Sequence, residues 1–126
     1  MEIKKVFTSK APEPAGHYSQ AVVANGLIFI SGQLPIIPET NEKITGKIED
    51  QTLRVLKNIE AITMAAGSNK SKIIKITVYI SDISMWGDVN RVYSAFFGKD
   101  KPARAVVPVG DLHYGFNIEM DAIAAL

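Results

Sequence analysis

Apolar residues recur with a helical period in two stretches of the chain. In residues 48–67 they return every three to four positions, which predicts a helix that ends at Gly67. Residues 84–98 predict a second helix, with Ser84 as its N-cap and Gly98 as its end. The side chains expected to share one face of the first helix are Leu53, Leu56, Ile59 or Glu60, Ile62 and Ala66.

Shorter β-rich runs predict strands in the N-terminal part of the chain, at residues 3–8, 21–24 and 27–32. The pair Asn25-Gly26 separates the last two of these runs. Both central positions of a tight hairpin turn need positive φ, and Asn and Gly adopt it most readily. The sequence therefore predicts a β-hairpin here.

The C-terminal part predicts three further strands, at residues 72–82, 103–109 and 117–126, while residues 11–19 and 33–46 contain Pro and Gly and predict loops. In the first and last of these strands, side chains alternate between an apolar face and a mixed face. The side chains expected on the apolar faces are Ile74, Ile76, Val78 and Ile80, and then Ile118, Met120, Ala122 and Ala124.

This order, β-ββ-α-β-α-ββ, predicts one α+β domain over residues 1–126. Two amphipathic helices can cover only one face of such a sheet. The uncovered face carries Asn117, Glu119, Asp121 and Ile123, which is too apolar for bare solvent and too polar for a core. We therefore expect this face to form a subunit interface with polar sites built into it.

Composition narrows the possible functions. The chain has 126 residues with a net charge of +1, so its charge does not direct it toward nucleic acid or anionic lipid. It has no cysteine, which excludes disulfides, thiolate metal sites and a cysteine nucleophile. His17 and His113 are far apart, so no metal site is expected, and His113 with Tyr114 lies in a predicted turn. No run is long enough to cross a membrane and no signal peptide is recognisable, so a cytoplasmic protein is expected.

Arg104 and Glu119 are the main candidates for chemistry. Each lies in a predicted strand among apolar neighbours, and the segment around Arg104 has the pattern of a buried strand. One interpretation is a structural ion pair across neighbouring strands, or two solvated edge residues. The other is that Arg104 binds a substrate carboxylate in a bidentate manner, while Glu119 holds a water or transfers a proton.

Three further positions have a functional and a structural interpretation. Tyr18 and Ser19 follow a Pro/Gly loop and could lie at the mouth of a site, or Tyr18 could cover an apolar patch. Gly32 ends a strand, where glycine permits close approach of a ligand to the backbone but also suits a turn. Asn90 lies within a packing face of the second helix, which favours a structural hydrogen bond. No phosphate-binding loop, dinucleotide fingerprint or Gly-x-Ser-x-Gly motif is present.

Several segments in order carry a family resemblance: TSKAPEPAGHYSQAV, LIFISGQLP, QTLRVLKNI, VYISD, VNRVYSAFF, PARAVV and IEMDAIA. Pro-Ala-Arg at residues 102–104, followed by a hydrophobic strand and Ile-Glu-Met at residues 118–120, matches a C-terminal signature. Together these motifs resemble the RidA family of reactive intermediate deaminases, also called YjgF, over nearly the whole chain.

The resemblance implies a chorismate-mutase-like fold, a single-layer mixed β-sheet with two helices on one face, and a homotrimer with sites at the subunit clefts. It also implies a cofactor-independent hydrolase that removes reactive enamine and imine intermediates, a form of metabolite damage control. Such a 2-iminobutanoate/2-iminopropanoate deaminase converts compounds such as 2-aminoacrylate, released by pyridoxal-phosphate-dependent dehydratases, to 2-keto acids and ammonia.

Residue roles follow from the same resemblance. Arg104 is expected to bind the substrate carboxylate and Glu119 to position the attacking water. Tyr18 and Ser31 would line the pocket, and Gly32 and Val106 would contribute backbone groups. Independently of the resemblance, Asn90 is a further candidate for substrate binding.

The chain departs from the family pattern at a few positions. His17 and His113 stand where proline is usual, Val106 where cysteine is frequent, and Trp86 where phenylalanine is frequent. A backbone role for residue 106 is compatible with valine, whereas a thiol role is not. The arginine of the deaminase branch is retained as Arg104.

Two other functions remain open from the sequence. The same arginine would serve a non-catalytic protein that binds small carboxylates such as 2-ketobutyrate. A ribonuclease or translation inhibitor, an activity attributed to some relatives, fits poorly with the near-zero net charge and the absence of a basic stripe.

Overall fold

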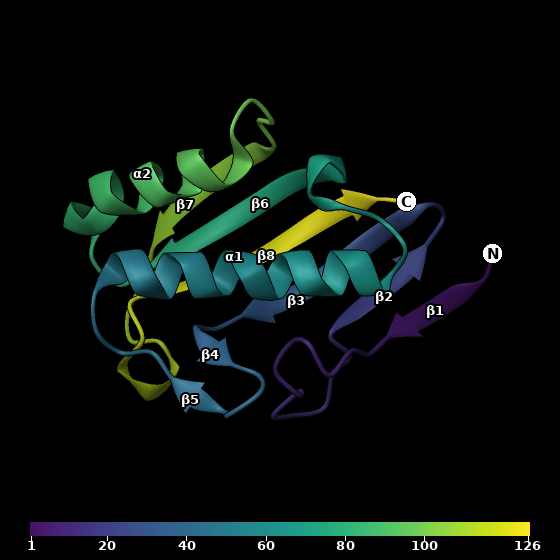
Figure 1. Cartoon of the computed structure of the whole chain (residues 1–126), viewed down its shortest axis with the longest axis horizontal. Coiled ribbons are helices and arrows are strands. Elements are labelled where there is room, and N and C mark those ends of the chain that lie inside the picture. The colour runs from purple at the N-terminus through teal and green to yellow at the C-terminus, as the bar shows by residue number, and fades with distance from the viewer.

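The computed structural model describes all residues from 1 to 126 and is built around one six-stranded sheet (Figure 1). The strand order is β1-β2-β3-β8-β6-β7. The elements that form the sheet and its helical layer are β1 (Ile3–Val6), β2 (Ala21–Ala24), β3 (Leu27–Gln33), α1 (Ile48–Ala65), β6 (Ile73–Ile80), α2 (Trp86–Phe97), β7 (Ala103–Pro108) and β8 (Ile118–Ala125).

The strands are antiparallel except for β6 and β7, which run parallel. Parallel neighbours need a crossover connection, and α2 supplies it between these two strands. Because β8 then pairs with β3 and β6, the last two strands of the chain are not neighbours. The β7 strand forms one edge of the sheet.

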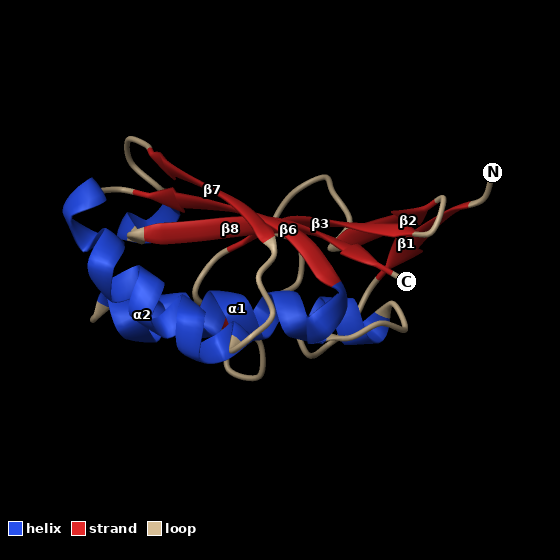
Figure 2. Cartoon of the chain, turned by 90° about the horizontal axis from the view of Figure 1, so that it is seen from above, coloured by secondary structure: helices blue, strands red, loops and turns tan.

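Both helices pack on the same face of the sheet, as Figure 2 shows. The core lies between these two layers and is made of apolar side chains from all the longer elements. The largest side chains of this core include Leu56, Ile59, Ile76, Ile80, Ile118 and Met120. The mixed sheet and its single helical layer confirm the predicted α+β fold.

The Asn25-Gly26 hairpin is confirmed. Asn25 has φ of 52° and Gly26 has φ of 77°, so both central residues are left-handed. The register places Ala24 opposite Leu27 and leaves a two-residue turn. The hairpin also binds the C-terminus, since the Leu126 N–H donates to the Gly26 carbonyl oxygen at 3.0 Å.

The first helix ends as predicted, but its buried face differs from the expectation. Gly67 has φ of 95° and follows the last helical residues. Leu53, however, is 38% exposed, while Thr52 and Val55 are fully buried. At about 100° per residue, Leu53 lies roughly 120° around the helix from Ile59, outside the buried stripe. The prediction for Leu53 was therefore wrong.

Ile74 is a second correction. It is 47% exposed, while its neighbour Ile73 is buried. The pairing of β6 with β8 shifts register between Ile73 and Lys75, and this irregularity turns Ile73 rather than Ile74 toward the core. From Ile76 onward the predicted alternation holds.

The second helix begins differently from the prediction. Ser84 is not its N-cap, because a short 3₁₀ helix (η2, Ile83–Met85) precedes α2. The side chain of Asp82 caps this turn by accepting a hydrogen bond from the Ser84 N–H at 2.9 Å. The predicted end is confirmed, since Gly98 has φ of 61° and follows directly.

The region predicted as an extended loop contains a small two-stranded ribbon, β4 (Ile36–Ile37) and β5 (Glu42–Lys43). Strands of two residues are too short to show a period in the sequence. The Asn58 side chain on α1 donates to the carbonyl oxygens of Leu34 and Ile36, at 3.1 and 3.0 Å, and so fixes this segment against the helix.

The sheet face opposite the helices remains uncovered, as expected. It carries Phe29 and Ile123, which are register partners, and the polar side chains of Tyr79, Glu119 and Asp121. The face is thus mixed in character. None of the helices combines the length and the apolar composition that crossing a membrane requires.

Candidate functional site

Arg104 lies on the exposed edge strand β7, so the prediction that it sits in a buried strand was wrong. Its guanidinium carbon lies 4.5 Å from the ring centre of Trp86 and 4.7 Å from that of Tyr93. Its Nη1 donates to Asn90 Oδ1 at 3.1 Å. Cation–π contacts and one hydrogen bond, all from α2, therefore hold the charge in place.

No carboxylate pairs with this guanidinium. The ion pairs of the chain both involve Arg91, with Glu49 and with Asp88. A cavity of about 390 Å³ lies beside Arg104 and extends to the loop before β7. The planar donor fork of the guanidinium is thus oriented by aromatic rings and free to accept a carboxylate.

Tyr93 has a polar group without a partner in this region. It is 6% exposed, and its buried hydroxyl makes no hydrogen bond. Burial raises the pKa of Tyr93, and the nearby charge of Arg104 opposes this. The tyrosine therefore stays neutral near pH 7 and offers Arg104 an uncharged ring face.

Glu119 lies on the central strand β8 and faces the uncovered side of the sheet. It is half-buried beside Tyr79, its register partner, whose hydroxyl donates to Asp121 Oδ2 at 2.9 Å. Burial raises the pKa of the Glu119 carboxyl, the charge of His113 lowers it, and that of Asp121 raises it. A carboxylate with a raised pKa is suited to accept and return a proton.

Gly32 makes room for Glu119. A Cβ atom at position 32 would overlap the carboxylate oxygen of Glu119 and lie 3.2 Å from its Cδ. The close approach occurs where β3 and β8 lose register, between Ile30 and Gln33. The glycine thus permits a close approach, and the group that approaches within the chain is the Glu119 side chain.

Ser31 and Tyr18 lie near Gly32 but are held by different contacts. Ser31 Oγ donates to the Ser19 carbonyl oxygen at 2.6 Å, and the Ser31 N–H donates to the Gln20 carbonyl oxygen at 2.9 Å. The Tyr18 side chain is half exposed, and its hydroxyl accepts from the Ala15 N–H at 3.3 Å. The tyrosine hydroxyl is therefore accessible to solvent or a ligand.

The loop that carries Tyr18 is fixed by the buried side chain of Gln20. Its amide nitrogen donates to the carbonyl oxygens of Thr8, Ala11 and Pro12, and its amide oxygen accepts from the Thr8 N–H. These bonds satisfy backbone groups that have no partner in a strand or helix. The loop before β2 thereby has a defined conformation despite its Pro and Gly content.

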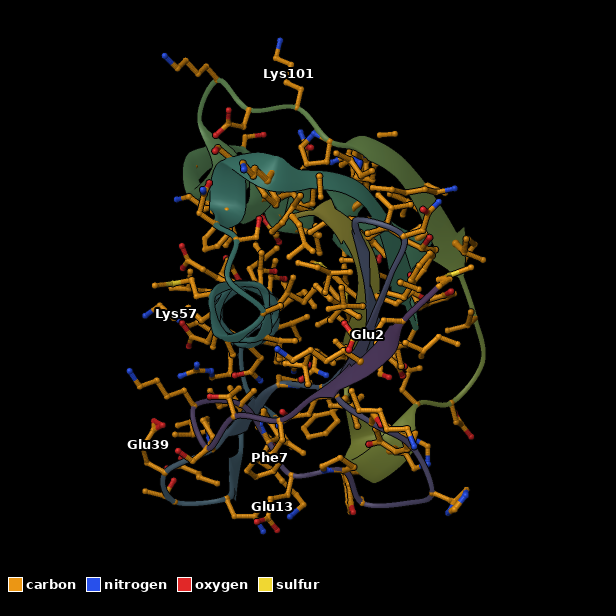
Figure 3. All side chains as sticks on the ribbon, turned by 90° about the vertical axis from the view of Figure 1, so that its right-hand side faces the viewer. Glu2, Phe7, Glu13, Glu39, Lys57 and Lys101 are labelled. Atoms are coloured by element: carbon orange, nitrogen blue, oxygen red, sulfur yellow. The ribbon has the colours of Figure 1, made fainter.

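A cavity of about 740 Å³ lies between this loop, the β4–β5 ribbon and the turn after β7. Its lining includes Tyr18, Gly32, His113 and Tyr114. The Arg104 cavity is elsewhere: Lys101, which lines it, lies at the opposite end of the molecule from Glu13, which lines the larger cavity (Figure 3).

Arg104 and Glu119 therefore do not meet within one chain. The β6 strand separates their strands, and no ion pair joins them. The registers place Arg104 level with Ile76 and Glu119 level with Tyr79, on opposite faces of the sheet. The interpretation of a structural ion pair across neighbouring strands is thus wrong. Val106 shares the face of Arg104 and packs against the core.

No site role was predicted from the sequence for Trp86, Tyr93 or His113. The aromatic pair had a detectable signal, because Trp86, Asn90 and Tyr93 recur at the three- to four-residue spacing that puts side chains on one helix face. His113 had none, since its place beside the cavity depends on a turn geometry that the sequence does not reveal. No group of three or more potential metal-ligating side chains lies together in the chain.

Comparison with known proteins identifies the family. The family model for endoribonuclease L-PSP matches residues 8–126. A RutC family protein of Pyrococcus abyssi is 48% identical over 119 residues, which cover 94% of each chain. The chloroplastic Reactive Intermediate Deaminase A of Arabidopsis thaliana is 41% identical over 121 residues, which cover 96% of this chain and 65% of that protein.

Solved structures agree with this assignment. The Rid family protein YyfA from Yersinia pestis has a TM-score of 0.96 at 40% identity, covering 99% of this chain and 100% of that one. The TdcF protein of Escherichia coli, solved with bound serine, has a TM-score of 0.93 at 36% identity and covers 98% of each chain. Sequence and structure together show that the chain belongs to the endoribonuclease L-PSP family, the family also known as YjgF or RidA.

Proposed function

We propose that this protein is a 2-iminobutanoate/2-iminopropanoate deaminase, which hydrolyses reactive enamine and imine intermediates to 2-keto acids and ammonia. Membership of the family supports a deaminase, and so does the 41% identity to a reactive intermediate deaminase. The observation that carries the proposal is Arg104, a guanidinium oriented by two aromatic rings and by Asn90 that lacks a carboxylate of its own.

The proposed substrate supplies the missing carboxylate. A 2-imino acid places a carboxylate next to its reactive C=N carbon, so a fork that fixes the acid group also fixes the carbon. The bound serine of the related TdcF structure has a carboxylate in the same position relative to its α-carbon. The Arg104 guanidinium would then either exchange its hydrogen bond to Asn90 for one to the substrate or keep both hydrogen bonds.

Glu119 provides the acid–base step in this proposal. The oxygen of a water molecule adds to the carbon of the N-protonated imine while the Glu119 carboxylate accepts one of the water protons. Glu119 returns that proton to the nitrogen, which gives a carbinol with a protonated amine. The C–N bond then breaks and releases ammonia while Glu119 takes the hydroxyl proton and passes it to that ammonia, leaving a 2-keto acid and ammonium. No redox step occurs, and a raised pKa suits a group that must both accept and return a proton.

The two groups must come from different chains to act on one small substrate. Arg104 on β7 and Glu119 on β8 are separated by β6, which is two strand spacings of about 4.8 Å, or roughly 10 Å, and their side chains lie on opposite faces of the sheet. A four-carbon imino acid is much shorter than this. We propose that the Glu119 region of one chain faces the Arg104 edge of its neighbour.

An interface between two different surfaces closes into a ring when repeated by rotation. The resemblance to the RidA family implies three chains in that ring, and the mixed uncovered face offers the surface for it. The test is mass: small-angle scattering should give about three times the 13.7 kDa of one chain. A monomer at micromolar concentration would contradict the shared site.

The remaining candidates have narrower proposed roles. Tyr18 would close the site over the substrate with its accessible hydroxyl, and Ser31 would hold the backbone beside Gly32 in position. An edge strand leaves part of its backbone unpaired, so residue Val106 on β7 can offer a backbone group to the ligand. We further propose a cytoplasmic protein that acts without a cofactor on imines released by pyridoxal-phosphate-dependent dehydratases.

A non-catalytic receptor for small carboxylates is the second candidate, because the Arg104 region forms a self-contained anion site without Glu119. A dehydratase supplied with threonine or serine separates the two functions when imine loss is followed with and without this protein. Faster loss with catalytic amounts supports the deaminase. Binding of 2-ketobutyrate with an unchanged rate of imine loss supports the receptor.

A further inference from the structure

The three arginines of the chain are held by different kinds of partner. Arg91 forms ion pairs with two carboxylates, and Arg54 donates to a side-chain amide oxygen. Only Arg104 has its guanidinium over aromatic rings, those of Trp86 and Tyr93. A carboxylate partner occupies the N–H donors of a guanidinium, whereas a ring face attracts the cation and leaves those donors free for another group.

The two rings approach the guanidinium from different turns of α2. Trp86 and Tyr93 are seven residues apart, which at 1.5 Å per residue separates their backbones by about 10.5 Å along the helix axis. The guanidinium carbon is nonetheless 4.5 Å from one ring centre and 4.7 Å from the other, so it lies between the turns that carry them. Asn90 lies between the two in sequence and accepts from Arg104 Nη1 at 3.1 Å.

The core supports both rings. Tyr93 is 6% exposed, and its ring centre lies 4.8 Å from that of Phe97 within the core. Trp86 is partly buried and packs against the same core. The Tyr93 hydroxyl makes no hydrogen bond, so its contact with Arg104 is through the ring.

The β7 strand itself gives the Arg104 side chain little support. Its neighbours in sequence, Ala103 and Ala105, are small and exposed, and β7 lies at the edge of the sheet. A long side chain that must be ordered at the moment of binding weakens the affinity for the ligand. A guanidinium that two rings already hold avoids most of this cost.

We propose that Trp86 and Tyr93 are positioning residues for Arg104. Their rings hold the guanidinium in the orientation that accepts the substrate carboxylate, and they act without touching the substrate. This inference rests on the proposed function, in which Arg104 binds that carboxylate. It extends the function by assigning part of the affinity for the acid group to two aromatic residues of α2.

Removal of the less buried ring tests this role. W86L keeps an apolar side chain at the margin of the core, and calorimetric titration of the assembled protein with 2-ketobutyrate measures the effect. The Kd is expected to rise about three- to tenfold, the cost of ordering one long side chain on binding. W86F should restore most of the affinity because it keeps a ring face. Y93F should bind as the unsubstituted protein does, since the hydroxyl has no partner.

Phe96 supplies a matched control on the same helix. Its ring is partly buried against the core, and it lies 4.5 Å from Lys70 Nζ, so it receives a different cation. F96L should therefore leave the Kd for 2-ketobutyrate unchanged. An equal loss in F96L and W86L would overturn the inference, because altered packing of α2 would then explain both.

The mobility of the guanidinium provides a readout that needs no turnover. Labelled arginine gives three Nε–H signals in NMR spectra of the assembled protein, and R104A identifies that of Arg104. Without ligand, W86L should increase the fast motion of the Arg104 Nε–H bond, seen as a lower heteronuclear NOE, and leave Arg91 unchanged. This result with the weaker binding supports the inference even if no imine is hydrolysed.

Two results separate failure of this inference from failure of the proposed function. Undiminished binding of 2-ketobutyrate by R104A would contradict the proposed function and the inference together. Weaker binding by R104A, with W86L unchanged in Kd and in the mobility of Arg104, would overturn the inference alone.

Discussion

The β3–β8 region around Glu119 and the β7 edge around Arg104 affect the charge of their ionisable side chains in opposite ways. Glu119 is half-buried on a central strand, and the surrounding protein favours its neutral form. Arg104 is exposed on an edge strand, and the rings of Trp86 and Tyr93 hold its charge without neutralising it.

This difference suits the two regions to different chemical roles. A partly buried carboxylate with a raised pKa can exchange protons, whereas a permanently charged fork can fix an anion. In the proposed function each region supplies one of these roles, because Arg104 binds the acid group and Glu119 transfers the proton. Since the sheet keeps them apart within one chain, the proposed shared site requires that chains assemble.

Loss of the guanidinium should have the largest effect. R104A removes the fork and the anion site together, and we expect imine turnover to fall by roughly 10²-fold or more while the trimer persists. R104K should be milder, because lysine keeps the charge but not the bidentate geometry. The dehydratase-coupled assay measures both. Turnover of R104A at the unchanged rate would show that the β7 edge does not bind the substrate.

E119Q should affect the rate without affecting binding. Glutamine keeps the size of the side chain but cannot act as a base, so turnover should fall by roughly two orders of magnitude. Calorimetric titration with 2-ketobutyrate should show affinity retained or increased, since a nearby negative charge is removed. A parallel loss of affinity and rate would return Glu119 to a structural role.

G32A tests whether Gly32 is needed to accommodate the Glu119 carboxylate. The added Cβ would meet the end of the flexible Glu119 side chain, which can turn aside, so we expect reduced turnover and a loss of no more than about 1 kcal/mol in the free energy of unfolding. G46A is the matched control, because a Cβ at Gly46 meets nothing within 4 Å.

The double variant G32A/E119A sharpens this test. With the glutamate truncated, the cost of G32A in unfolding free energy should largely disappear. The same cost in both backgrounds would mean that Gly32 is needed for some other reason.

The smallest expected effect is on stability. Folding raises the pKa of Glu119, so its ionisation costs stability above that pKa and the cost is absent below the ordinary pKa of glutamate. E119Q should therefore increase the free energy of unfolding at pH 8 by roughly 0.5 kcal/mol, a small value because solvent screens a half-exposed group. Denaturant unfolding should show this gain vanish toward pH 4. A gain that is the same at both pH values would contradict the raised pKa.

The sequence predicted the fold through its regular elements and failed where local geometry overrides periodicity. The hairpin at Asn25-Gly26 and the ends of both helices were predictable, since each depends on residues with positive φ. Ile74 was not, because the irregularity in β6 that exposes it leaves no trace in the apolar pattern. The β4–β5 ribbon was missed because its strands are too short for a period.

The candidate residues could be selected from the sequence, but their arrangement could not. Arg104 and Glu119 were identified from their types and neighbours and from the family motifs. Their separation by β6 depends on a crossover that inserts one strand between two others, and residue spacing does not encode this. The spacing of Trp86 and Tyr93 on one helix face is visible in the sequence, but their contacts with Arg104 depend on how α2 packs beside β7, which no local pattern marks.

Mixed trimers test the division between the two regions most directly. R104A and E119Q chains, each nearly inactive alone, are combined by refolding a 1:1 mixture and assayed with the dehydratase. If each site takes Arg104 from one chain and Glu119 from its neighbour, random assembly restores both groups at about a quarter of the sites. We expect recovery of about a quarter of the activity of the unsubstituted protein. A mixture that stays as inactive as its two components would contradict it, because both groups would then come from the same chain.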